Sequence, residues 1–330
     1  MHLPLLKFRK PFHDGYKDIF VRNVMALQHE HHPDIFNKYP EYVRQNILSE
    51  KKSLKKNRDE NNIQNMMKEK KAAELLEILS KKGIDEVVCL KGIYLLKTLY
   101  KNFPGIRGMG DTDLLLKCKD FKNSRKILEK VAEVRPWNFR RPLYSRIYHE
   151  YPVHYKKDLF EIHRGQTALN LFKIDYDSFF SKAKQKTGIY GENYLIPSLE
   201  MMIVFFIIHD ISAGLTCYDY RHAAEMHIML SKADKEKLSA LCKKFGISRL
   251  LDFTLFFQSI LFQSEEHFQY NPSLFHAFVS EGEKKPFSFT GGDIFFKICI
   301  FRKEFLKKTL PAVLTSVPDL LIRHFKNQIL

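Results

Sequence analysis

The sequence predicts an α/β fold in which a small mixed sheet lies between helical regions. Three observations favour this class. Residues 87–116 run as an apolar stretch, a helical pattern, a glycine-rich loop and a second apolar stretch, which is the order strand, helix, loop, strand. Residues 147–155 and 157–164 have the pattern of two paired strands. Helical periodicity dominates most of the chain on either side of these segments.

The N-terminal part of the chain is expected to be helical. Short helices are predicted first, with breaks at Pro33 and Pro40. Apolar residues then recur at helical spacing, which predicts one helix over residues 59–82, with Gly83 as its C-cap. The lysine-rich run over residues 51–56 is either a solvated helix face or a contact for RNA.

The remaining elements follow from the same patterns. In order, they are a strand over 87–90, a helix from Lys91-Gly92, a turn at Pro104-Gly105, a loop over 106–110, a strand over 113–117, a helix over 121–131, the paired strands, and helices over 199–209, 218–230, 234–245 and 249–262. Residues 280–292 are expected to form a linker before a basic amphipathic tail. This predicts a helical N-terminal region (1–82), a core (83–195) and an α-helical C-terminal domain (196–330) that forms the opposite wall of a cleft.

Length and charge limit the possible functions. The chain has 330 residues, which is enough for one or two domains. Lys and Arg number 54 against 38 Asp and Glu, so the net charge is +16. A strongly basic protein attracts polyanions such as nucleic acids and nucleotides. The lysines are spread along the chain, however, so a generally lysine-rich composition explains the charge equally well.

Cysteine usage and the apolar runs indicate a cytoplasmic protein. None of the five cysteines has C-x-x-C spacing, which argues against a zinc site and a disulfide framework and fits a reducing compartment. The N-terminus lacks the long apolar core of a signal peptide. The longest apolar run, residues 201–208, is too short to span a bilayer, so no transmembrane segment is expected.

Two aspartates open the second central strand. Residues i and i+2 of a strand point to the same face, so Asp111 and Asp113 are expected to direct their carboxylates to one point. Carboxylate oxygens suit Mg²⁺, and two of them could also share a pair of ions for an in-line phosphoryl displacement. Aspartates that flank strands are also common turn and cap residues, so the pair alone is a weak signal.

Further candidates lie before and after this pair. Gly92 opens a helix directly after a strand, where backbone N–H groups can bind phosphate, and Lys91 and Arg107 could neutralise its charge. In the second of the paired strands, Glu161 and His163 share one face. If that strand lies beside the strand of Asp113, Glu161 completes a cluster of three carboxylates.

The chain resembles the DNA polymerase β-type nucleotidyltransferase superfamily, and within it a family of uncharacterised bacterial nucleotidyltransferases. The signature of that family is matched by Leu90-Lys91-Gly92, by RGMGDTDLL from Arg107 to Leu115, and by Glu161-Ile162-His163. The resemblance implies a polymerase β-like core, a phosphate site at Gly92, and metal ligands at Asp111, Asp113 and Glu161. Two departures are Ile93, where the superfamily often has Ser, and Glu instead of Asp at the third acid.

The resemblance implies an enzyme that transfers NMP from an NTP such as ATP to an acceptor hydroxyl, with Mg²⁺ or alternatively Mn²⁺. Asp111 and Asp113 would hold the ions, and Glu161 would be a ligand or the base. Lys91, Gly92, Arg107, His163 and Arg221 are the candidate contacts for the nucleotide phosphates. The alternatives are a D-x-D metal-dependent glycosyltransferase and a catalytically degenerate nucleotide-binding or interaction module.

The acceptor is predicted to be RNA, such as a tRNA end, or else a small molecule, sugar or peptide. The net charge, the run over residues 51–56, the Arg-aromatic segment over residues 135–146 and the basic segment over residues 302–308 favour RNA. Packing of the aromatic residues and general solvation of the lysines explain the same features without RNA. The sequence leaves the oligomeric state open.

Overall fold

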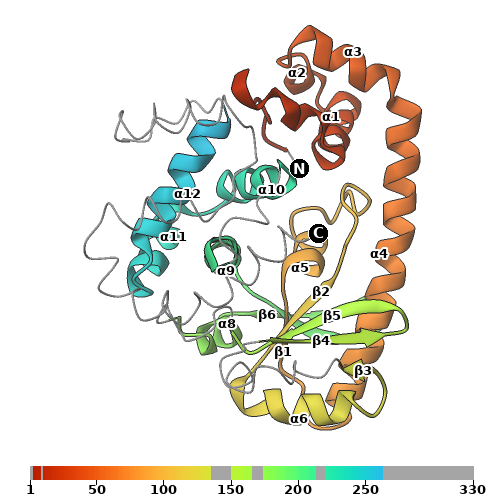
Figure 1. The fold of residues 1–330 in the computed structure, drawn as a ribbon, viewed down its shortest axis with the longest axis vertical. Helices are drawn as coiled ribbons and strands as arrows, with labels where there is room; N and C mark the ends of the chain where they lie inside the picture. The colour runs from red at the N-terminus through yellow and green to blue at the C-terminus, as the bar shows by residue number, and fades with distance from the viewer. Residues whose placement is uncertain (1–2, 9, 135–149, 166–173, 213–219, 263–330) are drawn as a thin grey trace, which may run out of the picture.

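The computed structural model describes residues 3–8, 10–134, 150–165, 174–212 and 220–262 (Figure 1). Its described strands form one mixed sheet in the order β3-β4-β5-β2-β1-β7-β6. The strands are β1 (Val87–Cys89), β2 (Thr112–Leu116), β3 (Glu133–Val134), β4 (Glu150–Tyr155), β5 (Asp158–His163), β6 (Lys184–Thr187) and β7 (Asn193–Ile196). Helices precede and follow the sheet, so the predicted α/β class with a mixed sheet is confirmed.

The centre of the sheet is formed by the two apolar runs that the sequence predicts as strands. β1 pairs with β2 in antiparallel orientation, and β2 pairs with β5 in parallel orientation. Every residue of β1 and β2 is buried, as expected for central strands that are covered on both faces. β4 and β5 form the predicted hairpin, with Lys156 and Lys157 at its turn in left-handed backbone conformation.

The N-terminal helices follow the predicted pattern, with one difference in length. Pro33 begins α2 and Pro40 caps α3, so the predicted breaks are confirmed. The helices are η1 (Lys10–Lys17), α1 (Ile19–His31), α2 (Pro33–Phe36), α3 (Glu41–Ser49) and α4 (Lys51–Ser80). The prediction that the long helix begins near residue 59 was wrong, because α4 already begins at Lys51. Its lysine-rich first turns consist of good helix formers, and the buried Leu54 anchors them.

Around the sheet, several elements begin earlier than predicted or were not predicted. α5 (Lys91–Lys97) starts at the predicted position, whereas α6 (Cys118–Leu128) starts three residues before residue 121. β3, β6, β7 and the short α8 (Asp177–Ser181) were not predicted. β6 is exposed at all four residues and reads KQKT, so it carries no apolar alternation that would indicate a strand.

The C-terminal part of the described chain is helical, as predicted. Its helices are α9 (Leu199–Ser212), α10 (Tyr220–Leu230), α11 (Lys235–Lys244) and α12 (Ser248–Leu261). The N-terminal segment reaches these helices, because Phe8 forms an isolated β-bridge with Phe262 and its ring contacts those of Phe262 and Tyr220 at 4.6 and 5.5 Å. Among the described helices, none combines the length and apolar character needed to cross a bilayer.

Several predictions fall on residues that lie outside the described ones. They concern the Arg-aromatic segment over residues 135–146, the linker over residues 280–292 and the basic segment over residues 302–308. The division into three parts with boundaries after residues 82 and 195 stays a prediction.

Candidate functional site

The two signature segments meet at the centre of the sheet. β5 lies beside β2, and Asp113 is paired in register with Glu161 across the two strands. This is the arrangement under which the sequence predicts that Glu161 joins the carboxylate cluster. Asp113 is completely buried, whereas the Glu161 side chain is 27% exposed, so the pair reaches solvent through Glu161.

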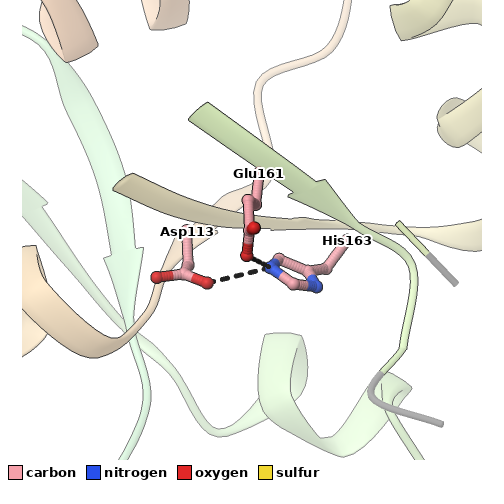
Figure 2. Close-up of side chains that lie close together, drawn as sticks. All are labelled: Asp113, Glu161 and His163. Atoms are coloured by element: carbon pink, nitrogen blue, oxygen red, sulfur yellow. Dashed lines mark hydrogen bonds and ion pairs between the residues drawn. The ribbon is translucent and has the colours of Figure 1, made fainter. Parts of the chain in front are cut away.

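Three side chains from these strands converge on one point (Figure 2). Asp113, Glu161 and His163 each offer an oxygen or nitrogen atom, and these atoms lie within 4.8 Å of one another. His163 Nε2 lies 3.0 Å from Asp113 Oδ1 and 3.7 Å from Glu161 Oε2. Glu161 and His163 meet because alternate residues of β5 point to the same face.

Asp111 is not part of this group of three. It precedes the first residue of β2 and is half-buried. Its negative charge is nevertheless close enough to contribute to the raised pKa of Lys91, which contacts Asp113. The structure therefore brings Asp113, Glu161 and His163 together and leaves Asp111 beside them, at the end of the loop that leads into β2.

Lys91 points to the carboxylates. Its Nζ lies 2.7 Å from Asp113 Oδ1 and 3.9 Å from Glu161 Oε2. Lys91 is the first residue of α5, and the preceding Leu90 donates its backbone N–H to the Asp113 carbonyl at 3.0 Å. The ladder between β1 and β2 thus fixes the position from which the lysine side chain starts. The sequence predicts this lysine as a phosphate contact, and that role stays a prediction.

Glu150 is a member of the site that the sequence analysis missed. Its Oε2 lies 3.1 Å from His163 Nδ1, so the imidazole lies between Glu150 and Asp113. Glu150 is opposite His163 in the antiparallel register of β4 and β5. The tight turn at Lys156-Lys157 sets that register, so counting back from the turn could have identified Glu150 as the partner of His163.

The charged groups of the cluster shift one another's pKa values. Burial alone would raise the pKa of Asp113, but the Lys91 ammonium and His163 hold it well below its usual range. Burial and the neighbouring Asp113 charge raise the pKa of Glu161 to about 7. Burial opposes the charged form of His163, yet its hydrogen bonds to Asp113 and Glu150 raise its pKa to about 9. At neutral pH the imidazole is therefore protonated. Its Nε2 donates to Asp113, and its Nδ1 lies within ion-pair distance of Glu150.

The donor set fits a divalent metal ion. Asp113 Oδ2 is buried and has no hydrogen-bond partner within the part of the chain that the structure describes. A buried carboxylate oxygen without a partner is costly unless a cation binds it. Oxygen donors from Asp113 and Glu161 suit Mg²⁺ and also Mn²⁺.

At Gly92, the close contact is made by the chain itself. A Cβ at Gly92 would lie 3.1 Å from Met109 Cγ and 3.2 Å from Met109 Sδ, so the absence of a side chain allows the loop before β2 to pack on α5. α5 is only seven residues long. The predicted role of Gly92 in phosphate binding stays a prediction, and the observed packing is a separate reason for glycine at this position.

Arg107 lies in the same loop but pairs with the C-terminal helices. Its Nε lies 2.9 Å from Glu225 Oε1 on α10, and both side chains are buried, at 9% and 0% exposure. Arg221 lies one turn before Glu225 on α10 and is half-buried. The structure thus places Arg107 at a contact between the loop and α10, and the predicted phosphate contacts of Arg107 and Arg221 stay untested.

A ladder of asparagines on α4 holds the loop that precedes Asp111. Asn61 donates to the Gly105 carbonyl at 3.2 Å, and Asn65 donates to the carbonyls of Pro104 and Arg107 at 2.7 and 2.8 Å. Asn65 Oδ1 also accepts the Met109 N–H at 3.0 Å. A spacing of four residues places such side chains on one helix face. This ladder was not predicted, although the repeated asparagines within an otherwise charged helix are a visible signal.

We expect Gly105→Ala to destabilise the protein by about 1–3 kcal/mol, because the added methyl group has no room. A Cβ at Gly105 would lie 2.0 Å from the carbonyl oxygen of Arg58 in α4, so the loop or the helix backbone would have to shift. Urea-induced unfolding would measure the effect. Gly110→Ala is the matched control, since a Cβ at this position of the same loop would meet no atom within 4 Å. Equal unfolding midpoints for the two variants would contradict the expectation.

The chain was compared with protein families, curated proteins and solved structures. A family model described as an uncharacterised nucleotidyltransferase matches residues 14–263. A search of curated proteins found no match. The solution structure of the antibiotic-resistance factor ANT(2'')-Ia matches with a TM-score of 0.41 and 11% identity over 59% of this chain and 99% of that chain. A crystal structure of ANT(2'')-Ia in complex with adenylyl-2''-tobramycin matches with a TM-score of 0.35 and 12% identity over 52% of this chain and 92% of that chain.

Proposed function

The chain belongs to the family of uncharacterised nucleotidyltransferases, and we propose that it transfers NMP from an NTP to an acceptor hydroxyl in a reaction that requires a divalent metal ion. The observation that carries the metal dependence is the buried, unpartnered Asp113 Oδ2 in register with Glu161. When bound, Mg²⁺ or Mn²⁺ would neutralise and orient the triphosphate.

Within this proposal, the carboxylates have distinct roles. Asp113 is the principal metal ligand, because its pKa lies below the usual range and it is ionised at every physiological pH. Asp111, two residues earlier in the chain, is the second ligand. Glu161 is either a third ligand or the base that takes the acceptor hydroxyl proton, and a pKa of about 7 suits a base at neutral pH. His163 donates to Asp113 and holds its carboxylate in one orientation.

The nucleotide phosphates would approach this cluster from the side of the loop before β2. Gly92 and Arg107 lie close together there, since a Cβ at Gly92 would be 3.6 Å from Arg107 Nη1. Lys91 supplies positive charge directly beside the carboxylates. Arg221, on α10, is the candidate phosphate contact from the C-terminal helices.

The test is incubation of the full chain with each labelled NTP, with Mg²⁺, with Mn²⁺ or with EDTA, and with and without total RNA. We expect pyrophosphate release that depends on the metal ion. Release of UDP from a UDP-sugar, without pyrophosphate from any NTP, would instead identify a glycosyltransferase. No turnover of any NTP, together with no NTP binding in calorimetry, would indicate a degenerate module.

RNA is the acceptor that the charge of the chain favours, and we expect its binding to weaken steeply with salt. Each neutralised phosphate of a single strand contributes a log–log slope of about −0.7. The lysines of residues 51–56 lie exposed on α4. A variant in which four of them (Lys51, Lys52, Lys55 and Lys56) are changed to Gln should bind RNA more weakly, and its affinity should depend less steeply on the salt concentration.

The matched control for this titration makes four Lys→Gln changes on α11, at Lys235, Lys237, Lys243 and Lys244, which are also exposed. If both variants lose the same affinity, the effect is one of net charge and the α4 run has no special role. If the unmodified chain binds RNA no better than a neutral protein does, a small-molecule acceptor is favoured, because its binding should depend weakly on salt.

A further inference from the structure

The carboxylates of the site already hold a cation that belongs to the chain. The Lys91 ammonium lies 2.7 Å from Asp113 Oδ1 and 3.9 Å from Glu161 Oε2, and its side chain is only 14% exposed. On the basis of the nucleotidyl transfer proposed above, we propose that this ammonium group takes the place of a second divalent ion, so that the site binds a single one.

The backbone of Lys91 supports a dedicated role for its side chain. Its φ is +40°, in the left-handed region that residues with a Cβ adopt at a cost. The other two described non-glycine residues with positive φ, Lys156 and Lys157, form the turn of the β4–β5 hairpin, where such angles are required. Lys91 lies in no such turn, because it follows β1 and begins α5. Strain of this kind persists where the surroundings enforce it, and it is concentrated at functional sites.

The two carboxylate oxygens of Asp113 can bind different cations, the Lys91 ammonium group on Oδ1 and a divalent ion on Oδ2. Oδ1 lies 2.7 Å from Lys91 Nζ and 3.0 Å from His163 Nε2. Oδ2 is buried and has no hydrogen-bond partner among the described residues. A divalent ion on Oδ2 therefore does not need to displace the lysine from Oδ1. A second divalent ion on the Oδ1 side would face the ammonium group at close range, and like charges repel strongly in a buried site.

The test is a titration of the full chain with Mn²⁺ in the absence of nucleotide, followed by the electron paramagnetic resonance of the free ion. We expect one ion per chain for the unmodified protein. Lys91→Met keeps the length of the side chain and removes its charge, so we expect it to bind Mn²⁺ at least tenfold more tightly. A lysine that only contacts phosphate would leave Mn²⁺ affinity unchanged under these conditions.

Lys97→Met is the matched control. Lys97 lies on the same helix, α5, and pairs with the nearly buried Glu69 at 2.7 Å, so the variant also loses one positive charge and one ion pair. Its Mn²⁺ affinity should equal that of the unmodified chain. Lys91→Arg retains a cation and should also bind Mn²⁺ as weakly as the unmodified chain does.

Lys91→Gly covers the case in which Lys91→Met does not fold. Glycine adopts a positive φ without strain, so this variant removes the ammonium group and relieves the backbone at the same time. It too should bind Mn²⁺ at least tenfold more tightly. Two Mn²⁺ ions per unmodified chain, or an unchanged or weaker affinity in the folded charge-removing variants, would overturn the role of Lys91. The proposal of nucleotidyl transfer would be refuted by a different result, namely that the unmodified chain turns over no NTP with any metal ion.

Discussion

Replacing Asp111 and Asp113 together by asparagine is expected to abolish NMP transfer, with a loss of about 10³-fold or more. Charge stabilisation by a metal ion is worth several kcal/mol, and each 1.36 kcal/mol corresponds to a factor of ten in rate. Asparagine keeps the shape of the side chain and one carbonyl oxygen that Lys91 and His163 can still contact. The loss would therefore reflect the missing negative charge. Pyrophosphate release from labelled NTP measures it.

The same variant needs a test of its fold, because Asp113 is completely buried between two cations. Alanine at this position would remove the buried carboxylate that both cations share, and such losses typically cost about 3–5 kcal/mol. Asp158→Asn is the matched control, since Asp158 begins β5 and pairs with Lys71 away from the cluster. We expect it to retain full transfer. Undiminished turnover in the Asp111 and Asp113 double variant would refute the assignment of the site.

The residues at the centre of the site could be predicted because two short-range rules locate them. Alternation along β5 places Glu161 and His163 on one face, and the apolar run after Asp113 identifies β2 as a central strand. The pairing of β5 with β2 joins segments that lie far apart in the sequence. The predicted carboxylate cluster was conditional on this neighbourhood, and the register of Asp113 with Glu161 fulfils the condition. The family signature placed these segments in one site but said nothing of their distances.

The residues that the sequence analysis missed are connected through contacts between distant segments. Asn65 on α4 holds a loop about forty positions later in the chain, and nothing local to either segment indicates the other. Lys91 has a left-handed backbone angle that lysine rarely adopts, so the direction of its side chain could not be predicted from a helix pattern. β6 and β7 are four residues each, and the polar surface of β6 gives no periodic signal.

The buried pair of Arg107 and Glu225 illustrates how such a contact bears on the site. The two residues are 118 positions apart in the chain, and their Nε and Oε1 atoms lie 2.9 Å apart at 9% and 0% exposure. Arg107 lies four residues before Asp111, in the loop that α4 holds from the other side. The pair therefore couples α10 to the segment that positions the aspartates. The hydroxyl of Tyr100 is buried nearby, and after burial the charge of Glu225 is the next cause of its raised pKa.

Glu225→Ala is accordingly expected to lower the free energy of unfolding by about 3–5 kcal/mol, since removal of one partner leaves the buried guanidinium without its counter-charge. Urea-induced unfolding measures the change. Glu60→Ala on α4 is the control, because Glu60 belongs to an exposed ion pair with Lys56 whose loss should cost no more than about 1 kcal/mol.

The double variant Arg107→Met with Glu225→Leu separates the cost of the unpaired charge from the value of the pair. Apolar side chains of similar volume often replace a buried ion pair without loss of stability. We therefore expect the double variant to unfold at a urea concentration close to that of the unmodified chain, and clearly above that of Glu225→Ala. If it folds stably but transfers NMP more slowly, the pair contributes to the position of the loop before Asp111 beyond its part in stability. If Glu225→Ala costs less than about 1 kcal/mol, α10 is not coupled to this loop through the pair.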